Sequence, residues 1–378
     1  MIVKSLKLKN YRNYDLLNIE FDKATNIFYG DNAQGKTNIL EAVYLSGMTK
    51  SHRGTKDRDL IKFEEDEAHI ETIIEKNGIP YQIDMHLKKN SPKGIAINKM
   101  PIRKASELFG LMNFVFFSPE DLNIIKNGPA ERRRFMDLEL SQLDKVYLKD
   151  LASYNRIVNQ RNKLLKDYFY ENKSELMDTL EVWDMQLVTY GNKIIERRKQ
   201  FIKEMNEIIC DIHQKLTGGR EVIQLSYESG CGAFTMEQAL ARNRERDIRM
   251  KSTSVGPHRD DICFIAKNVT KSDDGTVCRS SEEIDIRKFG SQGQQRTAAL
   301  SLKLSEIELV KRIIKDTPVL LLDDVLSELD KNRQNYLLDS IHDIQTFITC
   351  TGLDEFVNHR FAINKVFHVV DGQVSREN

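Results

Sequence analysis

The sequence predicts a mixed α/β fold with a second, helical lobe. Three observations predict this: short runs of alternating apolar and polar residues open the chain, a glycine-rich turn follows at residues 30–37, and apolar residues recur every three or four positions across 129–216. The length of 378 residues is enough for two or three domains.

Composition narrows the class of protein. Lys plus Arg and Asp plus Glu both number 57, so nucleic acid would have to bind at local basic patches. The five cysteines form no C-x-x-C pair, which indicates neither a disulfide framework nor a cysteine zinc site. The first residues lack a signal peptide's apolar run, and no stretch approaches the roughly 20 apolar residues that span a bilayer. We expect a cytoplasmic protein without a membrane partner.

The first elements are strands followed by a loop and a helix. From Ile2 to Ile27 the alternation has the period of half-buried strands, and the run that ends at Tyr29 meets the glycine-rich turn. After Lys36 the apolar spacing becomes helical. Two more strands are predicted at 68–74 and 81–87, with KNGIP as the turn between them.

The segment 138–216 predicts an antiparallel helical arm. Apolar residues keep a four-three rhythm from Leu140 to Val158 and again from Leu176 to Ile194, and DYFYENK (167–173) is the predicted bend. At about 1.5 Å per residue the second helix would be roughly 60 Å long. We interpret the stripe, including Trp183, as the packing core of the arm. The last residues, GQVSREN (372–378), are interpreted as a polar tail.

The turn GDNAQGKT (30–37) has the spacing of a phosphate-binding loop. Glycines let backbone N–H groups curl around phosphates, Lys36 reaches the terminal phosphates, and the Thr37 hydroxyl is a ligand for Mg²⁺. Chance occurrence of so short a pattern is the alternative, but the strand before it and the helix after it argue against chance.

The run PVLLLDDVLSELD (318–330) predicts the second half of such a site. Four apolar residues before Asp323 and Asp324 indicate a buried strand that ends in two carboxylates. In a parallel sheet this strand lies near the phosphate loop, so Asp323 can hold the Mg²⁺ shell while Asp324 polarises a water. The alternative is an acidic surface turn.

A third motif, FGSQGQQRTAALSLKL (289–304), places a serine and amides before a long amphipathic helix. A helix N-terminus of this kind is a second surface suited to an anion, although Gly-Gln-rich turns are common.

Together the three motifs resemble the ordered motif set of ABC-type ATPase heads, the class that contains SMC and Rad50 proteins. The chain also resembles the RecF family of bacterial DNA-repair proteins, on eight blocks in register: NYRNY, GDNAQGKTNILEA, KSHRG, FSPEDL, KNGPAERRRFMD, GPHRDD, GSQGQQRTAALSLKL and LLLDDVLSELD. This resemblance implies an ABC-type P-loop ATPase head with ATP and Mg²⁺ as cofactors. It also implies an ATP-dependent homodimer, binding to single-stranded and linear double-stranded DNA, and work with RecR and RecO in loading a recombinase at gaps and in the SOS response.

The resemblance also assigns residues and lobes. Asp323 would bind Mg²⁺ through water, and Asp324 takes the place of the catalytic glutamate. The residues that would bind the phosphates and Mg²⁺ directly are Gly30, Asp31, Asn32, Ala33, Gln34, Gly35, Lys36 and Thr37. Arg12 takes the place of an arginine that reaches the phosphates, its alternative being a solvated strand-end residue. The partner's ATP would meet Ser291, Gly293 and Gln294, and the dimer seam Ser327–Asp330. The lobes expected are 1–105 and 251–378 for the ATPase and 106–250 for the helical part.

Two departures from the transporter pattern predict slow hydrolysis. Gln292 stands where transporters have glycine, and the strand TFITCT (346–351) ends without their switch histidine, so that Thr349 or Thr351 would orient water less well. The third motif, which takes the place of the transporter signature, lies far along the chain from the phosphate loop. In transporter motor subunits the signature follows the loop closely, so this spacing disfavours that class. A nuclease-linked SMC-like head would need a longer coiled coil or an added domain.

Three basic clusters are candidates for contacts with DNA phosphates: 50–58, Arg132–Arg134 and 241–251. Acidic residues are interleaved with them, so an ordinary solvated surface is an equally good interpretation of each cluster. The block GPHRDD (256–261) is interpreted as a structural ion-pair corner rather than a metal site.

Overall fold

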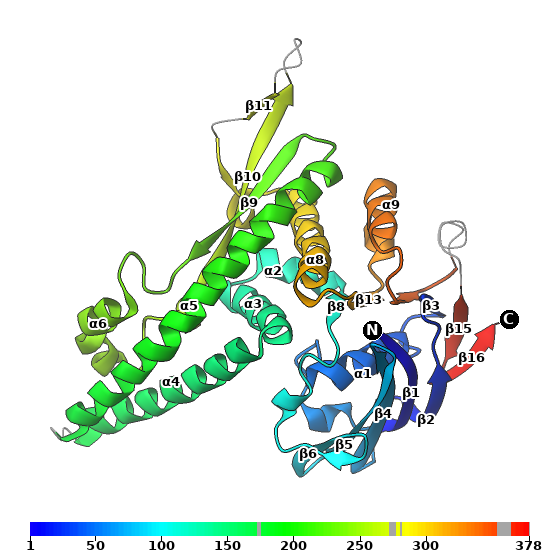
Figure 1. The fold of residues 1–378 in the computed structure, drawn as a ribbon, viewed down its shortest axis with the longest axis horizontal. Helices are drawn as coiled ribbons and strands as arrows, with labels where there is room; N and C mark the ends of the chain where they lie inside the picture. Colours follow the sequence, from blue (N-terminus) through cyan, green and yellow to red (C-terminus); the bar gives the residue numbers. More distant parts are fainter. Residues whose placement is uncertain (172–174, 272–276, 280–281, 354–363, 378) are drawn as a thin grey trace. The chain divides into compact units, whose positions relative to one another are not determined.

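The computed structural model describes residues 1–171, 175–271, 277–279, 282–353 and 364–377 (Figure 1). It divides into two compact units, of which the first comprises Met1–Asp121 and Glu306–Asn378 and the second Leu122–Ser305. These divisions differ from the sequence-based ones at 105/106 and 250/251, because strand pairing carries 114–117 into the first unit and 261–271 into the second. The division into functional lobes stays a prediction.

The first unit contains a six-stranded antiparallel sheet in the order β2-β1-β4-β5-β6-β7. Its strands are β1 (Ile2–Tyr11), β2 (Tyr14–Glu20), β4 (Glu67–Lys76), β5 (Ile79–Lys88), β6 (Ser91–Ile97) and β7 (Met100–Pro101). The predicted hairpin is confirmed: Asn77 and Gly78 both have positive φ, at 52° and 75°, as a tight two-residue turn requires.

A second six-stranded sheet follows the order β16-β15-β3-β14-β13-β8. Its strands are β3 (Thr25–Tyr29), β8 (Phe114–Phe117), β13 (Val319–Asp323), β14 (Thr346–Cys350), β15 (Lys365–Val370) and β16 (Gln373–Glu377). All pairs are parallel except β15 with β16. Strands β3, β14, β13 and β8 are almost entirely buried, as expected for the parallel part of a sheet covered on both faces.

Helix α1 (Lys36–Met48) contacts strands of both sheets, including β4, β13 and β14. Nearly all of its residues are buried, including Ile39, Val43 and Leu45. The remaining helical elements of this unit are η1 (Asp57–Leu60), η2 (Ala105–Glu107), η3 (Pro119–Asp121), η5 (Leu326–Glu328) and α9 (Lys331–Ser340). The phosphate-loop sequence therefore lies between β3 and α1, which confirms the predicted strand–loop–helix order.

The second unit is mainly helical. Its helices are α2 (Leu122–Lys126), α3 (Pro129–Leu143), α4 (Lys145–Glu171), α5 (Glu175–Leu216), α6 (Met236–Met250) and α7 (Ile286–Phe289), with η4 (Pro257–Arg259), and α4 and α5 are the longest of these. Strands β9 (Glu221–Glu228), β10 (Asp261–Lys271), β11 (Val277–Arg279) and β12 (Ile284–Asp285) form a small antiparallel sheet. Helix α8 (Gln292–Ile314) begins in this unit and continues into the first.

The arm is an antiparallel pair of helices, α4 and α5. Arg161 of α4 pairs with Asp184 of α5, whereas the earlier Tyr147 contacts the later Arg198, so the two helices run in opposite directions. With 42 residues, α5 is about 63 Å long. Leu180, Leu187 and Ile194 are buried, as predicted, whereas Trp183 is only half-buried and stands at the margin of the stripe.

Two expectations about element ends are wrong. The upstream arm helix begins at Lys145 and not before, because the Asp144 carboxylate accepts hydrogen bonds from the N–H groups of Val146 and Tyr147 and so starts a new helix. The C-terminal residues 373–377 are a strand rather than a fraying tail, since β16 pairs with β15. Residues 167–171 of the predicted bend belong to α4, and its last two residues, 172 and 173, lie outside the described residues.

Among the described residues, no helix is both long enough and apolar enough to cross a bilayer.

Candidate functional site

The candidate site lies at the carboxyl ends of three parallel strands in the first unit. Register pairs Cys350 with Tyr29 and Asp323 with Thr349, so β3, β13 and β14 end side by side. Side chains that follow parallel strands gather at this edge, which is where open α/β sheets bind ligands.

The two glycines of the loop are required by its conformation. Gly30 has φ 148°, and a Cβ there would stand 2.3 Å from the carbonyl oxygen of Val369. Gly35 has φ 112°, and its Cβ would stand 2.5 Å from the side chain of Asn13. Both backbone conformations favour glycine, and both positions leave no space for a side chain.

Neighbouring residues hold the loop from outside. The Asn13 amide donates to the carbonyl oxygen of Gln34 at 3.0 Å and accepts from Asn38 at 2.8 Å, while the Tyr14 hydroxyl donates to Gly35 at 3.0 Å. Burial raises the pKa of Tyr14 above its usual value, which keeps this hydroxyl protonated as a donor. Sequence reasoning missed this role of Asn13 and Tyr14, although both belong to the NYRNY block.

Within the loop, Asp31, Asn32 and Ala33 are exposed, whereas Lys36 is 4% exposed. The Lys36 ammonium donates to the carbonyl oxygens of Gly30 and Asp31 at 2.7 and 2.9 Å. The lysine therefore folds back over its own loop, where phosphates would lie in a loop of this kind.

Asp323 joins the loop to the neighbouring strand. Its Oδ1 accepts hydrogen bonds from the hydroxyls of Thr37 at 2.7 Å and Thr349 at 2.8 Å. Burial raises the pKa of Asp323 above its usual value, and the two hydroxyl bonds oppose this shift. A hydroxyl and a carboxylate are the oxygen ligands that suit Mg²⁺, so this pair fits the ion that the sequence predicts.

Asp324 follows in a strained conformation, with φ 52°. Its backbone N–H donates to the Thr349 hydroxyl at 2.9 Å. Thr349 thus binds both acidic residues, while Thr351 is exposed two positions later. The sequence left open which threonine serves the site, and the structure places Thr349 at the Asp323 carboxylate and the Asp324 backbone.

Arg12 lies in an ion pair that the sequence did not predict. Its Nε and Nη2 donate to the two carboxylate oxygens of Glu41, each at 2.9 Å. Glu41 is fully buried on α1 and also accepts from Ser51 at 2.5 Å. Burial alone would raise the pKa of Glu41, but Arg12 and Ser51 outweigh it and lower the pKa. Glu41 orients the arginine, whose contact with a phosphate stays a prediction.

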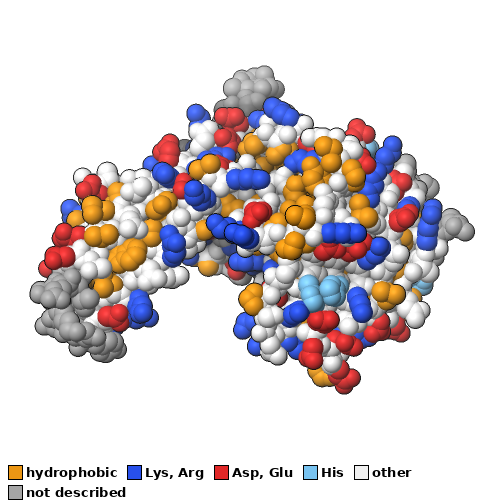
Figure 2. All heavy atoms as spheres, turned by 60° about the horizontal axis from the view of Figure 1, so that its bottom comes forward, with side chains coloured by type: hydrophobic (Ala, Val, Ile, Leu, Met, Phe, Trp, Pro, Cys, Tyr) orange, Lys and Arg blue, Asp and Glu red, His pale blue; other side chains and the backbone are white. Residues whose placement is uncertain are grey.

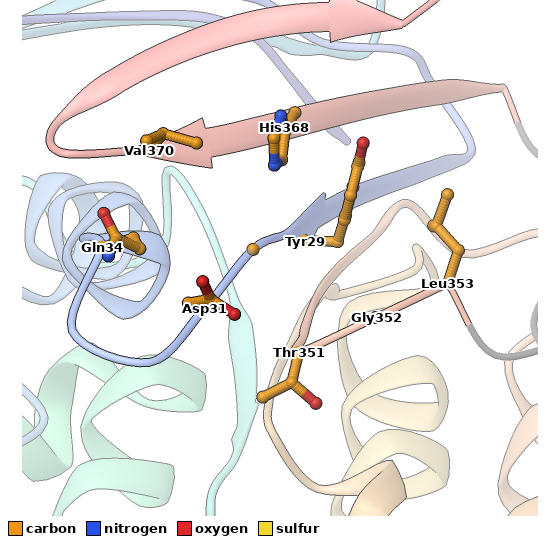
Figure 3. Close-up of a pocket in the computed structure, with 9 residues that line it drawn as sticks. Tyr29, Asp31, Gln34, Thr351, Gly352, Leu353, His368 and Val370 are labelled. Atoms are coloured by element: carbon orange, nitrogen blue, oxygen red, sulfur yellow. The ribbon is translucent and has the colours of Figure 1, made fainter.

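A pocket of about 330 Å³ adjoins the loop (Figure 3). Gly30, Asp31 and Gln34 line one side, and the remaining lining residues are Tyr29, Thr351, Gly352, Leu353, His368 and Val370. The rings of Tyr29 and His368 stack with centroids 4.6 Å apart. The sequence did not predict that His368 and Val370 line the pocket, because the pairing of β15 with β3 joins segments that are far apart in the chain.

The predicted signature turn lies in the second unit. Ser291 and Gln294 bond each other reciprocally, at 2.9 Å from the Ser291 N–H to Oε1 and at 3.3 Å from the Gln294 N–H to Oγ, and α8 begins between them. Ser291 and Gly293 are exposed, whereas the Gln294 amide donates to Glu221 at 2.6 Å. Glu221 also bonds the buried His213 at 2.7 Å. These partners orient Gln294 and were not foreseen from the sequence.

The ion-pair interpretation of the GPHRDD block is confirmed. The fully buried Asp260 bonds Arg198 at 2.6 Å and the hydroxyl of Tyr227, and Asp261 bonds Arg132 and Arg287. Arg132 is 4% exposed and also donates to carbonyl groups at the end of α2. Arg132 is therefore a packing residue, and the prediction that it contacts DNA is wrong.

The other two basic clusters are largely exposed. Arg53, Lys56 and Arg58 lie on the surface of the first unit, and Arg246 and Arg249 lie on α6 of the second. Basic and acidic side chains are interspersed on the face shown in Figure 2. The surface therefore agrees with the balanced net charge, and no single basic field dominates this face.

The fold and the site define an ABC-type P-loop ATPase head, and comparison with known proteins specifies its family. Residues 2–375 match the family described as RecF/RecN/SMC N terminal domain. The chain is 64% identical over 374 residues to the DNA replication and repair protein RecF of Agathobacter rectalis, covering 99% of each chain. The chain belongs to the RecF family.

Solved structures agree with this assignment. The chain is similar to a structure described as the recombination mediator protein RecF-ATP in the RecFOR pathway, with 34% identity, a TM-score of 0.88 and coverage of 100% and 97% of the two chains. It also shares its fold with a Smc head domain from Pyrococcus furiosus, at 18% identity, a TM-score of 0.54 and coverage of 99% and 95%. The predicted fold class is confirmed.

Proposed function

We propose that this chain is an ATP-binding DNA repair and replication protein in which ATP acts as a switch for dimer formation on DNA. The single observation that carries the proposal is the convergence of Thr37, Asp323 and Thr349 beside the phosphate loop. Solved relatives described as RecF-ATP and RecF-ATPrS, each 34% identical, support ATP as the nucleotide.

In this proposal Lys36 and the loop backbone from Gly30 to Thr37 hold the phosphates. Thr37 and, through water, Asp323 would hold Mg²⁺, which when bound neutralises developing negative charge on the phosphates. Asp324 orients the attacking water, and Arg12, oriented by Glu41, reaches the phosphates. Because Thr349 is already committed to both aspartates, water is positioned weakly and hydrolysis is slow.

The dimer is proposed to be symmetric, with Ser291, Gly293 and Gln294 of one copy meeting the nucleotide of the other. Exposure of Ser291 and Gly293 supports this role. ATP binding then stabilises the dimer by mass action, and hydrolysis releases it. We propose that this cytoplasmic dimer binds single-stranded and linear double-stranded DNA, and that with RecR and RecO it supports recombinase loading at gaps and SOS induction.

Two variants test the switch. Lys36→Arg keeps the charge but cannot reproduce the two short ammonium contacts, so ATP-dependent dimers should be lost. Asp324→Asn should retain ATP-dependent dimers and DNA binding while turnover falls. Analytical ultracentrifugation and DNA-binding titrations, with and without ATP, measure both. Dimerisation and DNA binding of both variants at the wild-type level would refute the switch.

A second candidate is the ATPase head of another SMC-like complex, which the shared fold with the Smc head favours. It predicts ATP-dependent dimers without a requirement for RecR. A transporter motor subunit is the weaker alternative, since the strand before Thr351 lacks the switch histidine.

A further inference from the structure

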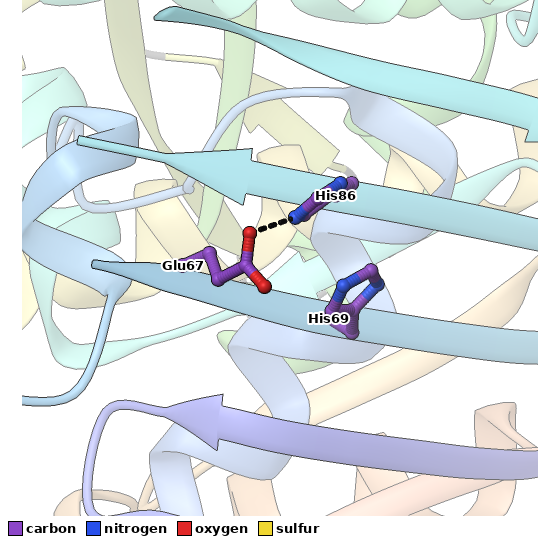
Figure 4. A group of neighbouring side chains, drawn as sticks. All are labelled: Glu67, His69 and His86. Atoms are coloured by element: carbon purple, nitrogen blue, oxygen red, sulfur yellow. Dashed lines mark hydrogen bonds and ion pairs between the residues drawn. The ribbon is translucent and has the colours of Figure 1, made fainter. Parts of the chain in front are cut away.

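Three potential metal ligands gather on the antiparallel sheet of the first unit. Glu67 and His69 lie two residues apart on β4, so their side chains leave the same face of the strand. His86 on β5 lies directly opposite His69 in the strand register. All three therefore share one small area of one sheet face (Figure 4).

Their ligand atoms are already close together. The His86 Nε2 and Glu67 Oε2 atoms are 2.8 Å apart, and the imidazole rings of His69 and His86 stack with centroids 3.9 Å apart. One nitrogen or carboxylate oxygen from each residue lies within 4.8 Å of the others. An ion between them would need bonding distances of about 2.0–2.2 Å, which rotation of the side chains would have to provide.

The core does not need these side chains. The alternate residues of the same strands, including Ala68, Ile70, Met85 and Leu87, are buried and pack beneath the sheet. Glu67 and His69 are exposed and His86 is partly exposed. On the next strand Gly94 lies opposite His86 and offers no side chain to cover it. The cluster is thus open to solvent.

We propose that Glu67, His69 and His86 form a binding site for a divalent transition-metal cation, with Zn²⁺ as the best fit. Two imidazoles and one carboxylate are a ligand set that Zn²⁺ accepts in proteins, and they leave one coordination position open. Such a set discriminates against Mg²⁺, which prefers oxygen ligands. None of the three ligands belongs to the phosphate-loop site, so the proposal does not depend on the proposed ATP switch.

The surrounding charges moderate the site. By register Lys9 lies beside His69 and Lys88 beside Glu67, while Glu71 and Asp84 occupy the next row. Lys7 is paired with Glu71 at 2.8 Å. Lys9 and Lys88 weaken cation binding and Asp84 strengthens it, whereas the charge of Glu71 is offset by Lys7, so the three ligands must supply the affinity themselves.

The test is a Zn²⁺ titration of the full chain by isothermal calorimetry, with excess Mg²⁺ present and thiols kept reduced. His69→Ala, His86→Ala and Glu67→Gln each remove one ligand from a largely exposed position, so folding should persist. His342→Ala is the matched control, because His342 is an exposed histidine outside the cluster. The thermal unfolding midpoint with and without Zn²⁺ provides a second measurement.

We expect one Zn²⁺ to bind the wild type and His342→Ala alike, and each ligand variant to bind it at least about 10-fold more weakly, since even outer partners of a metal ligand change affinity about 10–100-fold. Zn²⁺ should raise the unfolding midpoint of the wild type and lose this effect in the variants. The proposal is overturned if Zn²⁺ does not bind the wild type more tightly than about millimolar. It is equally overturned if His69→Ala and His86→Ala bind Zn²⁺ as the wild type does.

Discussion

Replacement of Thr349 by valine tests how the candidate site is held together. Thr349 is 1% exposed. Its hydroxyl donates a hydrogen bond to Asp323 at 2.8 Å and accepts one from the Asp324 N–H at 2.9 Å. Valine keeps the shape and removes both hydrogen bonds. Of the two hydroxyl groups that donate to the Asp323 carboxylate, only that of Thr37 then remains.

The expected loss can be worked out from these two bonds. A hydrogen bond to a charged group contributes about 1.5–3 kcal/mol, and a buried donor left without a partner costs about 1–3 kcal/mol. Asp324 is only partly buried, so water recovers part of the second cost. We expect Thr349→Val to lower the free energy of unfolding of the first unit by about 2–4 kcal/mol.

Thr351→Val is the matched control, because Thr351 follows the same strand but is exposed at the pocket. Its effect should stay within about 0.5 kcal/mol. Urea unfolding of both variants, compared by midpoint at constant slope, measures the difference. Equal losses in the two variants, or a loss below about 0.5 kcal/mol for Thr349→Val, would refute the hydrogen-bonding role assigned to Thr349.

Three further predictions concern the loop and the helical unit. Gly35→Ala should destabilise the first unit by more than about 1 kcal/mol and weaken ATP binding, since its Cβ would meet Asn13 at 2.5 Å; unchanged urea midpoint and ATP affinity would contradict this. Asp260→Asn should cost about 1–3 kcal/mol in urea unfolding, because the buried Arg198 loses one of its two carboxylate partners and keeps Asp137; a loss no greater than that of a surface Asp→Asn change would count against it. Burial lowers the pKa of His258 from 6.5 to about 4, so the unfolded chain binds the proton first, and stability present above pH 6.5 falls toward pH 4. His258→Gln should remove up to about 3 kcal/mol of that acid-induced loss, measured as unfolding free energy against pH, and an unchanged pH slope would exclude it.

Much of the fold could be predicted because local patterns and tertiary contacts agree. The strand before Gly30, the helix after Lys36 and the apolar strand before Asp323 each follow from residue spacing alone. Their meeting also follows, since parallel strands of one sheet present their carboxyl ends at the same edge. The long helices were predicted for the same reason, because their apolar stripe repeats over many turns.

Other features depend on which strands become neighbours. The C-terminal residues look like a polar tail, yet β16 is a strand because β15 offers it backbone hydrogen bonds. Arg132 lies in a run of three arginines that suggested contact with DNA, but its side chain is buried against Asp261. Composition does not distinguish a solvated arginine from one whose partner lies far along the chain.

The sequence by itself determined the phosphate loop, the acidic strand end, the helical arm and the family. These depend on residue types at short, fixed spacing, which local conformational preferences translate directly into structure. Only the tertiary structure decided that Glu41 holds Arg12, that Thr349 rather than Thr351 binds the aspartates, and that Glu67, His69 and His86 form one cluster. Each of these is a contact between separate elements, fixed by strand register and helix packing, and no short stretch of sequence contains both partners.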